Sequence, residues 1–172
     1  MKMIIRIQIA TLIFGLSASM TFGQTHHRVT ERDCNMFFPR SHSNEMTRSL
    51  DTGVSFAEVW EQGSWGPAEE FYGFVFVKTV QYQGKNIDLL AGVSKTGKIL
   101  GVRAKGNESV NDAFLAQFKG LTYESNFDLV QTQNDLLSVP SKIKSMQGKV
   151  DLSQSIAQGI KEIAQAANTV ID

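Results

Sequence analysis

The sequence predicts a single α+β domain in which an antiparallel β-meander is covered by a few helices. One long segment is rich in β-branched and aromatic residues, and two short turns join it to further segments with alternating apolar residues. The apolar period then changes to that of a helix. The turns are too short to contain helical crossovers, so the strands that they join must be antiparallel.

The first residues have the pattern of a signal peptide. Lys2 and Arg6 precede an apolar run, and the small residue Gly23 follows it. Gln8 interrupts the run, which is shorter than the roughly 20 residues that a membrane-spanning helix needs. We therefore expect residues 1–23 to be a cleaved signal peptide and the protein to be exported, to the periplasm or outside the cell. An uncleaved N-terminal membrane anchor is the alternative.

Residues 24–54 are predicted to be a disordered or loosely packed N-terminal arm. The stretch is polar and contains residues that can ligate metals, namely His26, His27, Cys34 and His42. Apart from the two adjacent histidines they are not closely spaced, which argues against a metal site. Cys34 is the only cysteine of the chain, so an internal disulfide is excluded.

The domain is expected to span residues 55–172 and to begin with a short helix. Ser55 and Glu58 have the spacing of a capping box. The apolar face that follows ends at Gly63 and consists of Phe56, Val59 and Trp60.

The meander follows as three strands. The segment Phe71 to Tyr82 is the strongest candidate, because it is dense in β-branched and aromatic residues. A turn at Gln83-Gly84-Lys85 leads to the second strand, and a turn in which Gly97 can adopt a positive φ leads to the third. One face of the second strand is formed by Ile87, Leu89, Ala91 and Val93, and one face of the third by Leu100, Val102 and Ala104.

Two helices are predicted after the meander. The first would end at Gly120 and has an apolar face of Val110, Ala113, Phe114 and Phe118. The second has a longer stripe of Leu152, Ile156, Ile160, Ile163 and Ala167. Between them, one more strand is expected around Phe127 to Val130.

Charge and motifs exclude several classes of function. The chain has 17 basic and 17 acidic side chains, so it has no long-range field that would attract nucleic acid. It contains no nucleophile elbow, phosphate-binding glycine loop, H-E-x-x-H helix or C-x-x-C pair. Hydrolysis and nucleic-acid binding are therefore not expected.

The order of the predicted segments resembles the FMN-binding domain, which occurs in the C subunit of the sodium-pumping NADH:quinone oxidoreductase and in the G subunit of the Rnf complex. The similarity covers about residues 60–167. It rests on Trp65-Gly66-Pro67, Tyr72-Gly73-Phe74, the segment LLAGVSKTGKILGV from Leu89 to Val102, Asn107-Glu108-Ser109, and Gln117-Phe118-Lys119-Gly120. The resemblance implies an α+β fold, bound FMN and a role in electron transfer.

Two motifs of this family are only partly present. The family has an E-T-P-G turn after the third strand, where this chain has Glu108-Ser109-Val110-Asn111. The family also has an S-G-A-T segment at the start of the last helix, and its threonine carries FMN through a phosphoester. The corresponding segment here is Asp151-Leu152-Ser153-Gln154-Ser155-Ile156. The resemblance therefore implies noncovalent FMN, unless Ser153 or Ser155 replaces the threonine.

A flavin site is expected where the two helices start. The start of the last helix would hold the phosphate, because free amide groups and the helix dipole favour an anion there. The corner before the other helix would contact the polar part of the ring, and Trp65 or Tyr72 would lie beside it. The candidate cofactor-binding residues are Trp65, Glu108, Ser109, Ser153, Gln154 and Ser155.

Each assignment has an alternative that needs no ligand. Ser155 and Gln158 have the spacing of a capping box, and Asp151 disfavours a nearby phosphate. Ser109 would equally cap its helix, and Glu108 would be a solvated corner residue. The aromatic residues of the first meander strand would be packing residues.

The expected function is noncovalent FMN binding in extracytoplasmic electron transfer, with FMN and membrane-bound redox proteins as partners. The protein would convert no substrate alone and would be at most a flavin electron carrier. One alternative is a cofactor-free secreted binding or structural module on the same scaffold. Another is a protein that binds a different small ligand in the same cleft.

Overall fold

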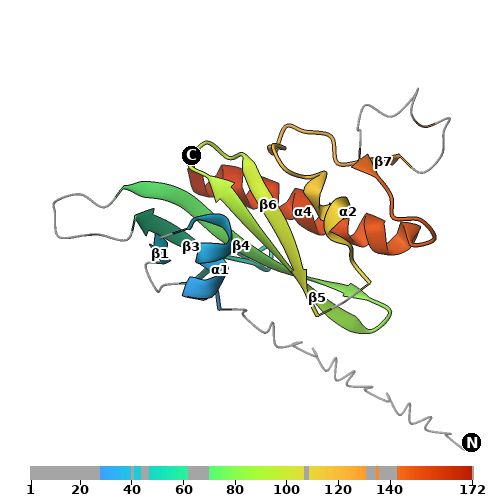
Figure 1. Ribbon diagram of the computed structural model, residues 1–172, viewed down its shortest axis with the longest axis horizontal. Helices are drawn as coiled ribbons and strands as arrows, with labels where there is room; N and C mark the ends of the chain where they lie inside the picture. Colours follow the sequence, from blue (N-terminus) through green and yellow to red (C-terminus); the bar gives the residue numbers. More distant parts are fainter. Residues whose placement is uncertain are drawn as a thin grey trace, which may run out of the picture.

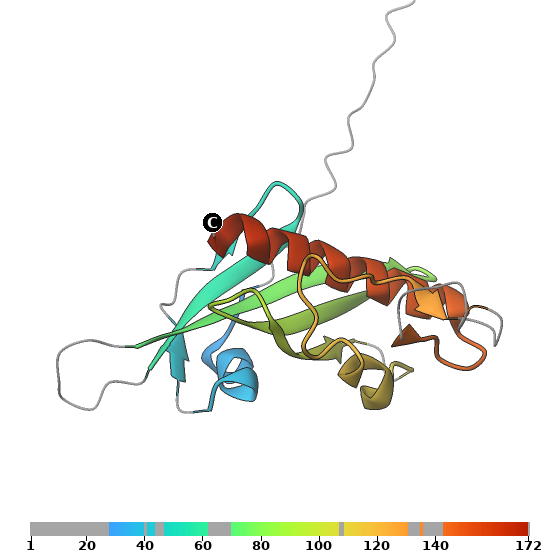
Figure 2. The ribbon, with the colours of Figure 1, turned by 90° about the horizontal axis from the view of Figure 1, so that it is seen from above.

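An antiparallel sheet organises the structure, and the helices are placed by the two faces of that sheet (Figures 1 and 2). The computed structural model describes residues 28–39, 41–43, 47–61, 70–106, 109–130, 135 and 143–171. The sheet has the order β1-β3-β4-β5-β6, and β2 also pairs with β3. Its strands are β1 (Ser41–Ser43), β2 (Arg48–Ser49), β3 (Val54–Glu61), β4 (Phe71–Tyr82), β5 (Lys85–Ser94) and β6 (Ile99–Lys105).

The helices lie on both faces of the sheet. Figure 2 shows the long helix α4 on one side of the sheet and α1 on the other. The predicted α+β class, a meander covered by helices in a single domain, is confirmed. The remaining elements are α1 (Glu31–Phe37), α2 (Asp112–Ala116), α4 (Val150–Ile171) and a small parallel pair of β7 (Leu129–Val130) and β8 (Ile143–Lys144).

The meander prediction is confirmed, including the bounds of its first strand. Tyr82 pairs with Lys85 across a two-residue loop, in which Gln83 and Gly84 have φ values of 49° and 73°. Two successive positive φ values are typical of a type I′ turn, whose twist matches that of the strands. The second hairpin turns at Gly97, with a φ of 77°.

One detail of the third strand differs from the prediction. The register between β5 and β6 shifts next to Gly92, and Leu100 is the extra residue of a β-bulge. Val102 and Ala104 belong to the core on the α4 side, whereas Leu100 packs against the apolar cluster on the other face. The prediction that the three share one face is therefore wrong for Leu100.

Residues 54–61 form a strand, so the short helix predicted there is wrong. Val54 and Phe56 face the core under α4, whereas Ala57 and Val59 face the apolar cluster under α1. A strand buried on both faces has no regular alternation of apolar and polar residues, so the strand period was not visible in the sequence. The Ser55 hydroxyl lies 3.0 Å from that of Ser49 on β2 and caps no helix.

The described residues of the predicted loose arm are packed, which corrects that expectation. Thr30 and Asp33 form a capping box at the start of α1. Val29, Cys34 and Phe38 are buried in the second apolar cluster, against β3, β4 and β5. This segment covers a sheet face that would otherwise be exposed to water.

Two predictions for the N-terminus concern residues outside the described ones. These are the signal peptide at 1–23 and the histidines His26 and His27. Among the described residues, no group of three or more His, Cys, Asp or Glu side chains is placed to hold a metal. In the same part of the chain, none of the helices has the length and apolar character needed to cross a membrane.

The predicted helices and the late strand are largely confirmed. Residues Leu152, Ile156, Ile160, Ile163 and Ala167 of α4 are all buried, as are Phe114 and Phe118 in and after α2. Ala113 is exposed, contrary to the prediction. The late strand is the two-residue β7. The cap of α2 is Asn111, whose Oδ1 accepts a 2.7 Å hydrogen bond from the Phe114 amide, so capping by Ser109 is wrong.

The closest approach of α4 to the sheet is at Gly159. A Cβ atom there would lie 2.6 Å from Val80 Cγ1 and 2.7 Å from Leu89 Cδ1. Glycine is the only residue that fits without displacing β4 or β5 side chains.

Asp33 connects α1 to the far strand of the meander. Its buried carboxylate accepts hydrogen bonds from the Lys105 ammonium and from the Thr30 hydroxyl and amide. Burial raises the pKa of Asp33, but these hydrogen bonds and the Lys105 charge outweigh it, so the pKa is lowered. The ion pair therefore stabilises the position of α1 while Asp33 is ionised.

Gly159→Ala is expected to destabilise the protein although alanine favours helices. Overpacking against Val80 and Leu89 costs about 1–3 kcal/mol, which exceeds the gain in helix propensity of about 1 kcal/mol. Urea unfolding gives the difference in the free energy of unfolding. Gln165→Ala, at an exposed position of α4, is the control and should change it by less than about 0.5 kcal/mol. A more stable Gly159→Ala variant would contradict the close packing.

Asp33→Asn is expected to lower the free energy of unfolding by about 1–2 kcal/mol near neutral pH. Because the folded-state pKa is lowered, this contribution is fully present above the unfolded-state pKa of about 3.9 and is lost as the pH falls through the folded-state pKa. Urea titrations at about pH 7 and about pH 3 measure the change. Exposed Asp51→Asn is the control. An equal difference at both pH values would show that the charge of Asp33 is not the cause.

Candidate functional site

A cavity of about 200 Å³ lies where the β4–β5 hairpin, the corner before α2 and the start of α4 meet. It is where the two helix starts expected to form a flavin site come together. We call it the Lys149 cavity. The described residues that line it are Tyr82, Gln83, Lys85, Ser109, Lys149 and Leu152.

The local sequence explains how the cavity is built. The two-residue β4–β5 turn places Lys85 directly opposite Tyr82, and the Gln83 side-chain amide donates a 3.2 Å hydrogen bond to the Tyr82 hydroxyl. The Lys149 ammonium donates a 2.9 Å hydrogen bond to the carbonyl oxygen of Ser109. This bond connects the start of α4 to the corner before α2, although the two residues are 40 positions apart.

The cavity is suited to an anion. Lys85 and Lys149 both contribute an ammonium group, and its described lining contains no carboxylate. Intrahelical hydrogen bonding of α4 begins with the 2.9 Å bond from the Ser153 amide to the Lys149 carbonyl, so the preceding amides have no partner within the helix. These amides and the helix dipole add partial positive charge. Asp151 in the first turn opposes it but does not line the cavity.

The predicted site residues of α4 do not line this cavity. Ser153 is fully buried, donates a 2.8 Å hydrogen bond to the Lys149 carbonyl and accepts a 2.9 Å bond from the Met146 amide. Gln154 is exposed, and the Ser155 hydroxyl donates to the Asp151 carbonyl at 3.0 Å. The structure thus gives both serines structural hydrogen bonds within their own chain segment.

The alternative reading of Ser155 as a helix cap is also wrong. Helix α4 begins at Val150, so Ser155 lies in its second turn, and the Gln158 side chain donates to Glu162 at 3.0 Å. Helix α4 therefore starts five residues before Ser155, and Leu152, which lies between Val150 and Ser155, already belongs to its buried stripe.

The other predicted site residues have three outcomes. Ser109 lines the cavity. Trp65 and Glu108 lie outside the described residues. Tyr72 stacks on Phe38 with ring centroids 6.4 Å apart, and it lies ten residues before Tyr82 on β4, roughly 33 Å away along the strand. Tyr72 is therefore not beside this cavity.

Lys85, Lys149 and Tyr82 were missed by the sequence analysis. Their local sequence does not mark them as ligand-binding residues, since lysines are common beside a hairpin turn and before a helix and a tyrosine is common in a strand. What makes them a site is that residues 64 positions apart, Lys85 and Lys149, line one cavity. That proximity depends on the tertiary fold and has no pattern in the sequence.

The remaining aromatic residues of β4 mostly pack within the core, which agrees with the alternative that they are packing residues and not ligand contacts. Phe74 and Phe76 are buried, with ring contacts to Phe56. A further cavity of about 470 Å³ at the C-terminal end of α4 is lined in part by Trp60, Phe71 and Phe74. It lies at the other end of the helix from Lys149.

The chain matches no protein-family model and no curated protein.

Ser153→Ala is expected to lower the free energy of unfolding by about 1–2 kcal/mol, because the buried Met146 amide loses its acceptor. Ligand binding at the Lys149 cavity should be unchanged, since the hydroxyl does not reach it. Urea unfolding and a flavin titration measure the two properties. Ser155→Ala serves as the control and should change stability by less than about 0.5 kcal/mol. A Ser153→Ala variant that is fully stable but no longer takes up flavin would contradict the structural role.

Proposed function

We propose that the protein is exported and binds FMN noncovalently, with a role in extracytoplasmic electron transfer. The observation that supports this most directly is the meeting of Ser109 and Lys149 at a cavity that also contains Lys85. The resemblance to the FMN-binding domain assigns the flavin to these same two helix starts.

The residues present fit the phosphate end of FMN. Two ammonium groups and a helix N-terminus are suitable partners for a phosphate monoester. The cavity of about 200 Å³ is smaller than the roughly 300–1,000 Å³ of usual small-ligand pockets, so the ring would extend beyond it. Tyr82 is the aromatic residue of the described lining.

In this proposal the protein binds FMN, and the bound flavin carries the electrons. Lys85 and Lys149 neutralise the phosphate, and Tyr82 and Gln83 restrict the orientation of the bound molecule. FMN, when bound, supplies one-electron or two-electron transfer. Membrane-bound redox proteins are the proposed electron partners. Noncovalent binding is favoured because neither Ser153 nor Ser155 lines the cavity.

The alternative function is a cofactor-free secreted binding or structural module. The small volume of the cavity favours it, because a site for an entire flavin would be larger. A protein that binds another phosphorylated small molecule at the two lysines is a third outcome.

Flavin binding is tested by fluorescence titration with FMN and with riboflavin, which lacks the phosphate. We expect FMN to bind the more tightly of the two. Lys149→Ala should weaken FMN binding by about threefold to tenfold, because a charge-assisted contact is lost, and should leave riboflavin binding unchanged. Lys161→Ala is the matched control, since it lies on the same helix roughly 18 Å away.

Two results would contradict the proposal. Equal affinities for FMN and riboflavin would place the phosphate elsewhere, and the absence of binding to either would favour the cofactor-free module. Acid precipitation of a yellow protein, isolated from a host that also contains a flavin-transfer enzyme, then distinguishes the type of attachment. Flavin released to the supernatant is noncovalent, whereas flavin retained in the pellet is covalent.

A further inference from the structure

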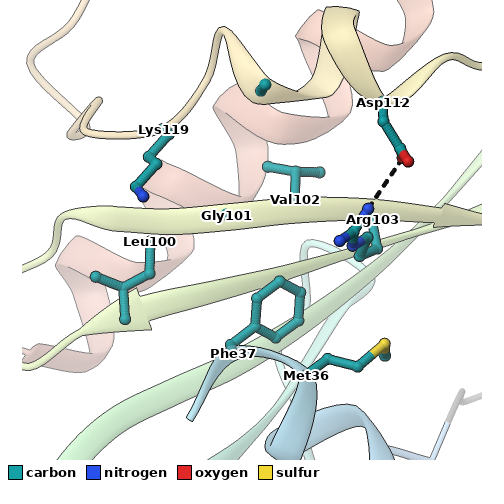
Figure 3. A pocket seen from close by; sticks show the side chains of 9 residues that line it. Met36, Phe37, Leu100, Gly101, Val102, Arg103, Asp112 and Lys119 are labelled. Atoms are coloured by element: carbon teal, nitrogen blue, oxygen red, sulfur yellow. Dashed lines mark hydrogen bonds and ion pairs between the residues drawn. The ribbon is translucent and has the colours of Figure 1, made fainter. Parts of the chain in front are cut away.

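A third cavity, of about 430 Å³, lies along β6 between α1 and α2 (Figure 3). It shares none of its lining residues with the Lys149 cavity. Its volume is within the roughly 300–1,000 Å³ range of small-molecule sites. Its described lining consists of Met36, Phe37, Leu100, Gly101, Val102, Arg103, Asp112, Ala116 and Lys119.

A pair of glycines positions Phe37 beside this cavity, and one of them, Gly101, lines it. Gly92 and Gly101 are directly paired on β5 and β6. A Cβ atom on Gly92 would lie 2.4 Å from Phe37 Cβ, and one on Gly101 would lie 3.6 Å from the Phe37 ring. The ring therefore packs closely on the paired glycines and forms an apolar wall, and Figure 3 shows it facing β6.

The charged groups of the cavity are not balanced. Arg103 Nη1 and Asp112 Oδ1 form an ion pair at 3.0 Å. Lys119 also lines the cavity, and Figure 3 shows its side chain extending from the end of α2 towards β6. Among the described residues its ammonium group has no hydrogen-bond or ion-pair partner. Two cations thus face one carboxylate, which leaves one positive charge uncompensated.

We propose that this cavity binds a small aromatic carboxylate. Its apolar body would pack on the walls formed by Phe37, Leu100 and Val102, and its carboxylate would pair with Lys119. A single anionic group matches the uncompensated charge, and a flat apolar body matches the aromatic wall. The Arg103–Asp112 pair fixes the other end of the cavity. This proposal does not depend on flavin binding at the Lys149 cavity.

The probes for this site are naphthoate and its uncharged amide, naphthamide, which have the same apolar body. We expect naphthoate, added to protein purified after expression of the full chain, to shift the backbone amide NMR signals of Gly101, Arg103 and Lys119. Naphthamide should bind about two- to fivefold more weakly, because an exposed ion pair contributes modestly. Lys119→Ala should reduce naphthoate affinity by the same factor and leave naphthamide affinity unchanged.

Two further variants test the location. Ala116→Phe would fill the cavity from an exposed position of α2 and should abolish the shifts, whereas Ala113→Phe, exposed on the same helix but outside the lining, should not. Lys149→Ala should leave naphthoate binding unchanged. Equal binding of the acid and the amide would overturn the proposal, as would binding that survives Ala116→Phe or the absence of shifts at this cavity.

Discussion

The close approach of α4 to the sheet is the constraint on which the rest of the structure depends. Gly159 lets the helix backbone approach the Val80 and Leu89 side chains, and the Lys78–Glu162 ion pair, at 2.8 Å, adds a polar contact between α4 and β4. The helix has 22 residues and is thus roughly 33 Å long. The contact at Gly159 therefore also fixes the position of the N-terminal end of α4, where Lys149 and Leu152 line the Lys149 cavity. The site exists because the helix cannot shift along the sheet.

The second constraint is that the central strands are buried on both faces. Helix α4 covers one face, and α1 with its flanking residues covers the other. The Asp33–Lys105 pair attaches α1 to β6, at the far side of the meander. Because Phe37 ends α1, this same attachment places the aromatic wall of the cavity along β6 over Gly92 and Gly101. The segment predicted to be a loose arm is thus part of both the core and a cavity.

Two elements with a strong apolar signal were predictable from the sequence. Strand β4 is long and dense in β-branched and aromatic residues, and α4 has an apolar stripe with the helical period, so the bounds of β4 and the buried face of α4 were correct. Strand β3 was not recognised, because burial on both faces removes alternation and the Ser55–Glu58 spacing imitates a helix cap. The bulge at Leu100 also leaves no local pattern. Among the predicted site residues, Ser109 lines the cavity, whereas the serines of α4 are held by backbone hydrogen bonds.

The two proposed anion sites, at the Lys149 cavity and at the cavity along β6, lie in a chain with balanced charge. With 17 basic and 17 acidic side chains, the protein has no net field that would concentrate ligands from a distance. Selectivity of the proposed sites would therefore come from lysines that form no ion pair among the described residues, namely Lys85 and Lys149 in one cavity and Lys119 in the other. These lysines are exposed, so water and salt screen their charges and each contributes little affinity alone. Discrimination between ligands must then arise mainly from the fit of the uncharged part, which is set by the strands and helices around each lysine.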